Sequence, residues 1–229
     1  MLPPSLFWRY HFHLPLMVFI LVAVTIEYAN LDILVADRIY AFEGGTWAFK
    51  DAWLTSTLIH KVGKHLSLLI ALCVFIALAQ SFLTQKLRNY RRELSYLLLA
   101  AGGGSALISG LKYISHVSCA WDFSRYGGSA EYASVFTELV NRTGGDCFPA
   151  GHASGGYAWI AFYFLGVHLQ SRLRWAGLLF ALGVGLVFGI SQQFRGAHFI
   201  SHDWWTLGIC WFFSLLCYRL VLLKHPKSL

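Results

Sequence analysis

Long apolar runs separated by short polar segments dominate the pattern of this chain. A bilayer-crossing helix needs about 20 mostly apolar residues. The runs are continuous rather than alternating, which favours helices over the strands of a membrane barrel. Six runs approach the required length: Leu14–Ala29, His65–Phe82, Leu94–Leu111, Ala153–Leu169, Trp175–Ile190 and Trp204–Leu223. The pattern predicts an all-α polytopic membrane protein, with six transmembrane helices in a bundle that forms a single domain over residues 1–229.

Two segments near the N-terminus need separate interpretation. No small-residue cleavage site follows the first run, so we expect it to be retained as a span rather than removed as a signal peptide. Residues 31–42 are too polar to cross a membrane, so we expect them to lie along the interface.

Composition supports the membrane assignment. The chain is 57% hydrophobic and 13% charged, whereas soluble domains carry about 25% charged residues. A soluble core of this size could not bury so much apolar surface, and disordered chains need few apolar residues. A water-soluble globule and a disordered chain are therefore both excluded.

The distribution of basic residues predicts the orientation. Short cytoplasmic segments of membrane proteins are enriched in Lys and Arg. Ten of the 18 basic residues fall in four short segments on one side of the predicted spans: Arg9, Lys86, Arg88, Arg91, Arg92, Arg172, Arg174, Arg219, Lys224 and Lys227. Both termini are therefore expected in the cytoplasm, and the net charge of +7 is mostly topological rather than a sign of nucleic-acid binding.

Three polar clusters lie on the opposite, outer side. Lys112 ends the third span, residues 147–152 lead into the fourth, and residues 195–203 lead into the sixth. Ionisable groups at the membrane edge are costly and therefore candidates for function. Because these clusters carry cations and imidazoles, they indicate an anionic ligand. His152 would start a helix, where free backbone N–H groups bind phosphate or sulfate.

The order and spacing of these clusters resemble the type 2 phosphatidic acid phosphatase superfamily, the membrane lipid phosphatases related to vanadium haloperoxidases. That family's pattern is Lys-x6-Arg-Pro, then Pro-Ser-Gly-His, then Ser-Arg-x5-His-x3-Asp. Six positions of this chain match it: Lys112, Pro149, Gly151, His152, Ser191 and His198. Five positions depart from it: Cys119, Ala120, Ala150, Gln192 and His202.

The resemblance implies a role for each matching residue. His198 would attack phosphorus and form a phosphohistidine, while His152 would protonate the leaving oxygen and then activate water. Lys112 and backbone N–H groups near Gly151 would neutralise the phosphate oxygens, which is usually the largest catalytic contribution. Such a mechanism needs no metal and no cofactor, because protein cations replace Mg²⁺.

The departures remove positive charge from the implied phosphate pocket. We expect Arg195, three residues after Gln192, and Arg125 in the outer loop to resupply it, with Gln192 still lining the pocket. The loss of several cations also leaves a catalytically inactive homologue as an alternative.

The aspartate position of the third motif is occupied by His202. Asp203 could take its place if the helix starts one residue later, and would then hold His198 in its nucleophilic tautomer. The less favoured alternative is that His202 itself orients His198, four residues away.

The five cysteines divide into two groups. Three lie inside predicted spans and are interpreted as small buried apolar residues: Cys73, Cys210 and Cys217. Cys119 and Cys147 lie in the outer loop, residues 112–152, which carries the first motif and leads into the second. An oxidising outer compartment favours a Cys119–Cys147 disulfide there, with two free thiols as the alternative.

These features together predict a membrane lipid phosphatase that hydrolyses a phosphate monoester or pyrophosphate at the outer membrane face. Candidate substrates are phosphatidylglycerol phosphate, phosphatidate, undecaprenyl pyrophosphate and a lipid A phosphate. The expected location is a bacterial inner membrane with the active site facing the periplasm. The expected partners are the lipid phosphate and membrane lipids, without nucleic acid or an obligate protein partner.

Four alternatives stay open at this point. A lipid phosphotransferase shares the chemistry up to the phosphohistidine. A rhomboid-type serine protease would use Ser154 and His198. A zinc hydrolase would use His152, His198, His202 and Asp203 as ligands. A transporter or a binding protein for anionic lipid would have no catalytic chemistry.

Overall fold

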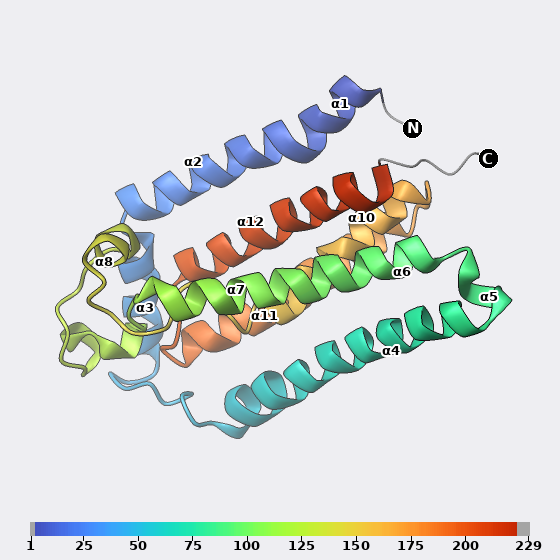
Figure 1. Ribbon diagram of the computed structural model, residues 1–229. Coiled ribbons are helices and arrows are strands. Elements are labelled where there is room, and N and C mark those ends of the chain that lie inside the picture. The colour runs from blue at the N-terminus through green and yellow to red at the C-terminus, as the bar shows by residue number, and fades with distance from the viewer. Residues whose placement is uncertain (1–2, 224–229) are drawn as a thin grey trace.

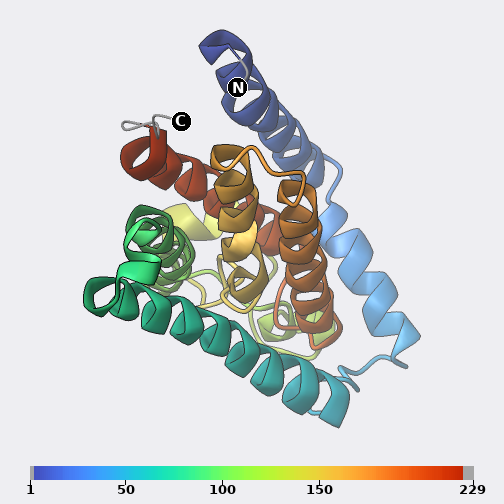
Figure 2. The ribbon, with the colours of Figure 1, turned by 90° about the vertical axis from the view of Figure 1, so that its right-hand side faces the viewer.

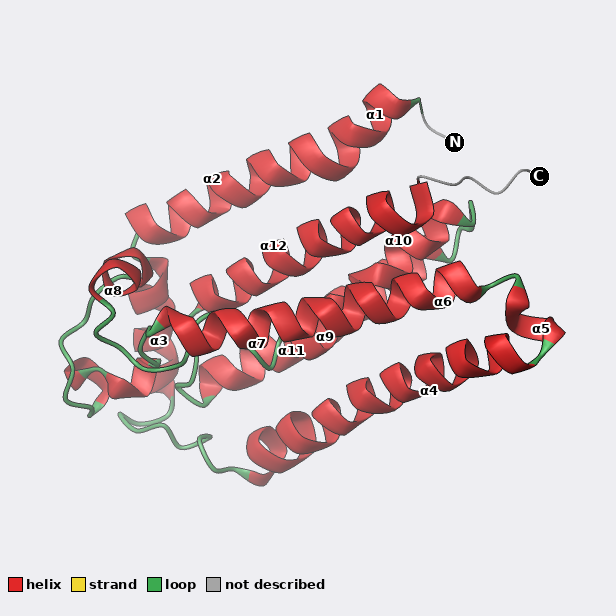
Figure 3. Ribbon diagram, viewed as in Figure 1, coloured by secondary structure: helices red, strands yellow, loops and turns green. Residues whose placement is uncertain are grey.

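The computed structural model describes residues 3–223 as helices joined by loops (Figures 1 and 3). Within that range, pairing between extended residues is limited to two isolated bridges, Val117 with Asp146 and Phe123 with Ala130. The six longest continuous helices run side by side. They comprise α1 and α2 (Pro4–Trp8, Leu14–Tyr28), α4 (Gly63–Leu83), α6 and α7 (Arg91–Leu97, Gly103–Ser115), α9 and α10 (Ser154–Tyr157, Ala161–His168), α11 (Arg174–Phe194) and α12 (Ile200–Cys217).

Several of these helices are extended by π-helical turns. The turn Arg9–His13 joins α1 to α2, Trp53–Val62 precedes α4, Leu98–Gly102 joins α6 to α7, and Tyr218–Leu223 follows α12. The shorter helices α3 (Leu31–Phe42), α5 (Gln85–Arg88) and α8 (Val135–Asn141) lie in the connections. The segment expected at the membrane interface is therefore helical over the predicted bounds.

Within residues 3–223, five helices are long and apolar enough to cross a membrane: Pro4–Tyr28, Trp53–Leu83, Arg91–Ser115, Arg174–Phe194 and Ile200–Leu223. The fourth predicted span is the exception. It forms the continuous helical segment Ser154–His168, which at about 1.5 Å per residue covers roughly 22 Å, against about 30 Å of hydrocarbon. By length and composition the described residues thus contain five candidate spans, and the count of six stays a prediction.

The short fourth segment lies at the centre of the bundle. Ile160, Ala161 and Phe164 are fully buried, and neighbouring helices surround the segment (Figure 2). Gly156 makes this packing possible, because a Cβ there would overlap the backbone of Gly185 on α11. Protein rather than lipid therefore surrounds this helix.

The outer faces of α2 and α4 are apolar and uncovered. Leu21 on α2 is 64% exposed, and Leu72 and Phe75 on α4 are more than half exposed. Contiguous apolar surface of this kind would be unstable in water but suits contact with lipid tails.

The two ends of the bundle differ. The start of α1, helix α5 and the end of α12 lie at one end, and α3, α8 and the long loop before α9 lie at the other (Figure 1). The basic segments used to predict orientation lie at the first end, although Lys224 and Lys227 fall outside the described residues. Which end faces the cytoplasm stays a prediction.

Candidate functional site

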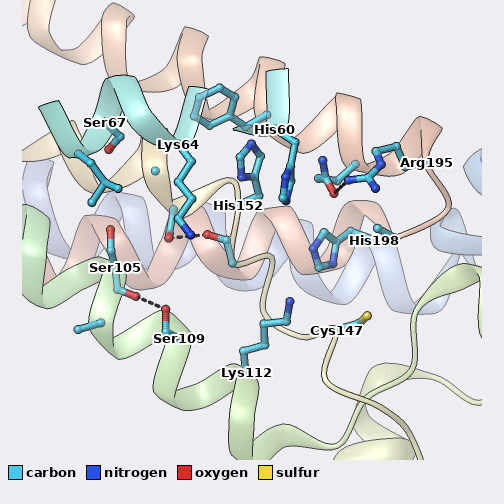
Figure 4. A pocket seen from close by; sticks show the side chains of 18 of the residues that line it. His60, Lys64, Ser67, Ser105, Ser109, Lys112, Cys147, His152, Arg195 and His198 are labelled. Atoms are coloured by element: carbon cyan, nitrogen blue, oxygen red, sulfur yellow. Dashed lines mark hydrogen bonds between the residues drawn. The ribbon is translucent and has the colours of Figure 1, made fainter. Parts of the chain in front are cut away.

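A cavity of about 690 Å³ opens at the loop end of the bundle. Its walls come from α4, α7, α11, the start of α9 and the loops beside them (Figure 4). Six of the eight residues selected from the sequence for catalysis or phosphate binding line this cavity: Lys112, Gly151, His152, Gln192, Arg195 and His198. Residues up to 86 positions apart in the chain thus converge on one space, as the three outer clusters predict.

Lys112 and Gly151 approach each other closely. Lys112 lies in the last turn of α7, and a Cβ on Gly151 would stand 3.4 Å from its Cδ atom. The Ser154 hydroxyl donates to the Gly151 carbonyl at 2.7 Å, which fixes the turn that enters α9. Because Gly151 has no side chain, its backbone is open toward Lys112.

His152 lies just before α9 and is held from two sides. Its Nε2 atom lies 3.3 Å from the Ile59 carbonyl oxygen, and because that oxygen can only accept, Nε2 carries the proton. The His60 ring stacks on it with centroids 4.4 Å apart and an angle of 25°. Burial, reinforced by His60, lowers the pKa of His152 to about 4, so the free imidazole is neutral at pH 7.

His198 lies in the turn between α11 and α12 and is only 5% exposed. Its Nδ1 atom lies 3.3 Å from Nδ1 of His202, one turn further on. Burial, together with His202 and Lys112, holds the pKa of His198 well below its usual range. The neutral form is the one that can act as a nucleophile.

The structure does not bring Asp203 to His198. Its Oδ2 atom accepts from Gln193 Nε2 at 2.6 Å instead, and its carboxyl packs against Gly189. Successive helical residues point about 100° apart, so His202 and Asp203 cannot both face the same imidazole. His202, the alternative that the sequence favoured less, occupies the position beside His198.

The two arginines proposed to replace the missing cations have different surroundings. Arg195 lines the cavity, where it donates to the Lys50 carbonyl at 2.7 Å and to Gln192 Oε1 at 3.2 Å. Arg125 is instead exposed and donates through two nitrogens to Asp37 at 2.6 Å each. It does not line the cavity, and it anchors the loop to α3.

The loop carries the predicted disulfide. Cys119 and Cys147 are bonded, with Cα atoms 5.1 Å apart, and Cys147 also lines the cavity. Glu138 of α8 accepts from the Ser118 backbone at 2.9 Å and from its hydroxyl at 2.6 Å. The first-motif position that lost its arginine therefore serves as a structural tie beside the cavity.

His60 and Lys64 are among the polar residues of the cavity wall that sequence reasoning missed. It placed the second span at His65, whereas the helix begins at Trp53. The four-residue spacing of His60 and Lys64 on a helix would have placed them on one face. Ser105 and Ser109 of α7 line the same cavity and follow the same spacing.

The other chemistries considered from the sequence find less support in the geometry. Within residues 3–223, no three His, Cys, Asp or Glu side chains converge as metal ligands would. The Ser154 hydroxyl, required by the protease alternative, donates to a backbone carbonyl.

Comparison with known proteins gives one finding. Residues 93–226, more than half of the chain, match the PAP2 superfamily. No curated protein and no solved structure matches the chain significantly. The matched region contains Lys112, His152, Arg195 and His198, but it leaves out α4.

Proposed function

Because the chain belongs to the PAP2 superfamily of phosphatases and phosphoesterases, we propose that it hydrolyses a lipid phosphate at the outer membrane face through a phosphohistidine. The observation that carries this proposal is the convergence of two neutral histidines, His152 and His198, with Lys112 and Arg195 in one cavity. Neutral imidazoles supply a nucleophile and a proton carrier, and fixed cations stabilise the charge on a transferring phosphoryl group.

The first step transfers the phosphoryl group to the protein. The Nε2 lone pair of His198 forms a bond to phosphorus while the bond from phosphorus to the leaving oxygen breaks. His152 passes a proton to that oxygen; the proton arrives with the phosphate monoanion, since the free His152 is neutral. His202 accepts the Nδ1 proton of His198 in a hydrogen bond, which keeps the lone pair on Nε2.

The second step restores the free site. His152 takes a proton from water as the water oxygen bonds to phosphorus, and the bond from phosphorus to His198 breaks. His152 then gives that proton to the inorganic phosphate, which leaves as the monoanion, and both imidazoles are neutral again. Lys112 and Arg195 neutralise the phosphoryl oxygens in both steps, and the mechanism uses no metal and no cofactor.

An amphiphilic substrate fits the position of the cavity. Its wall continues along membrane-crossing helices through Leu68 of α4 and through Ser105 and Ala106 of α7. A head group in the polar part would therefore leave its acyl or isoprenyl chains beside lipid. Phosphatidylglycerol phosphate, phosphatidate, undecaprenyl pyrophosphate and a lipid A phosphate remain the substrates to compare.

Phosphate release from this panel in detergent micelles tests the proposal. Wild-type protein should release phosphate from at least one lipid, and His198→Ala and His152→Ala should each lower kcat by at least about 100-fold. Undiminished activity in His198→Ala would overturn the nucleophile assignment. Absence of release, with the phosphoryl group appearing on a second lipid, would identify a phosphotransferase instead.

A further inference from the structure

The segment Ile59–Lys64 forms part of the cavity wall although it lies outside the matched region. It spans the last π-helical turn before α4 and the first residues of α4. Three of its groups are placed at the site: the Ile59 carbonyl on His152 Nε2, the His60 ring on the His152 ring, and Lys64 in the cavity wall (Figure 4). The family match by itself does not account for this contact.

The position of Lys64 bears on the positive charge available to a phosphoryl group in the cavity. Where the superfamily pattern has two arginines, this chain has Cys119, which is held in a disulfide, and Gln192, which is neutral. Lys64 and Arg195 are cations of the cavity wall that come from other positions of the chain. A transferring phosphoryl group carries negative charge on three equatorial oxygens, so it requires several positive groups.

The packing of α4 against its neighbours holds the segment Ile59–Lys64 beside His152. Gly63 lies between His60 and Lys64 in the chain, and a Cβ there would overlap the Phe188 ring of α11. That same ring contacts His152 with centroids 4.6 Å apart. One turn further along α4, the Ser67 hydroxyl accepts from Trp159 Nε1 at 3.0 Å. Helix α4 is therefore fixed against the residues that enter and follow α9.

We infer that the segment Ile59–Lys64 belongs to the catalytic site, with Lys64 binding the phosphoryl oxygens and His60 positioning His152. This inference rests on the proposed phosphatase function and adds to it two residues from a helix outside the family match. The stacked His60 ring and the Ile59 carbonyl restrict the rotation of His152, so its remaining nitrogen, Nδ1, is the one that exchanges protons.

Lys64 is tested with a soluble phosphate monoester, p-nitrophenyl phosphate, and with orthovanadate and inorganic phosphate as inhibitors. Lys64→Ala should raise KM and both inhibition constants by about 10- to 100-fold, because a charge-assisted contact is lost, and Lys64→Arg should restore most of the affinity. The matched control is Lys61→Ala, which removes an exposed lysine of the same turn that does not line the cavity. Equal constants for Lys64→Ala and Lys61→Ala would overturn the role of Lys64.

His60 is tested by the separation of kcat from KM. His60→Ala should lower kcat about tenfold with little change in KM, because His152 loses its stacking partner. His60→Phe keeps a flat ring at this position and should restore kcat. The positioning role is overturned if His60→Phe is as slow as His60→Ala, or if both match wild type. Thermal unfolding of each variant, compared with wild type, shows whether the change is confined to the site.

These results are separable from failure of the phosphatase proposal itself. If wild type and His198→Ala release equally little phosphate from every substrate, the proposed function fails. If wild type is active and His198→Ala is inactive while the Lys64 and His60 variants match wild type, only the present inference fails.

Discussion

The Nδ1 atoms of the buried side chains His198 and His202 lie 3.3 Å apart, and His198 lines the cavity. Both nitrogens cannot carry protons in a hydrogen bond, so one imidazole donates and the other accepts. When His198 donates, its Nε2 lone pair is free for attack. A pair of imidazoles thus takes the position that a histidine and a carboxylate occupy in the superfamily pattern.

We predict that His202→Phe lowers kcat by about 10- to 100-fold, because the acceptor for the His198 proton is lost while the ring volume is kept. His202→Asp should retain more activity, since a carboxylate also accepts that proton. Asp203→Asn, whose carboxyl contacts Gln193 rather than His198, should have a smaller effect. Steady-state phosphate release measures all three variants. A larger loss in Asp203→Asn than in His202→Phe would contradict the assignment.

We predict opposite results for the two arginines considered for phosphate binding. Arg195→Ala should raise the inhibition constant of orthovanadate by about 10- to 100-fold, because a cation of the cavity wall is lost. Arg125→Ala should leave it within about twofold, since Arg125 pairs with Asp37 outside the cavity. Inhibition curves under identical detergent conditions provide the comparison. A strong effect of Arg125→Ala would show that the loop reaches the phosphate during turnover.

The pH dependence of kcat/KM follows from the two neutral histidines. A lowered pKa means that each imidazole gains a proton only when the pH falls below that lowered value. The nucleophilic form of His198 is therefore fully present at higher pH. Because the pKa of His152 is about 4 and that of His198 is also lowered, the acid limb should lie below about pH 5 rather than near pH 6.5. An acid limb at pH 6 to 7 would contradict this prediction.

We predict that reduction of the Cys119–Cys147 bond destabilises the outer loop. The bond closes a separation of 28 residues, for which about 2–4 kcal/mol of stabilisation is typical. Thermal unfolding should shift to lower temperature in reductant, and the Cys119→Ser, Cys147→Ser double variant should reproduce the shift without reductant. Intact mass after alkylation supplies the check: a pair that alkylates without reductant would contradict the bond.

Much of the fold and part of the site could be predicted from the sequence. Apolar runs located the helices because lipid imposes length and composition directly on each segment. The fourth run was harder to interpret, because a helix buried in protein is as apolar as one that faces lipid. The histidines were found from their spacing, whereas the distinction between Arg195 and Arg125 depends on the path of a long loop, which no local pattern encodes.

The polar start of the helix Trp53–Leu83 also could not be predicted from local sequence. The residues before His65 look like a loop when hydropathy alone is considered, although they continue the helix from Trp53. His60 and Lys64 line the cavity, whereas Lys61 in the same turn is exposed and does not, and only tertiary structure distinguishes these two environments.

The spacing between α4 and α11 depends on the absence of a side chain at Gly63. Gly63 faces the Phe188 ring with no room for a methyl group, and that ring in turn contacts His152. Gly63→Ala would force the ring toward the imidazole or α4 away from α11. The first shift would displace His152, and the second would displace Ile59, His60 and Lys64 together. One uncharged, chemically inert position thus controls the alignment of the whole constellation, and activity can be lost there while every titratable group is retained.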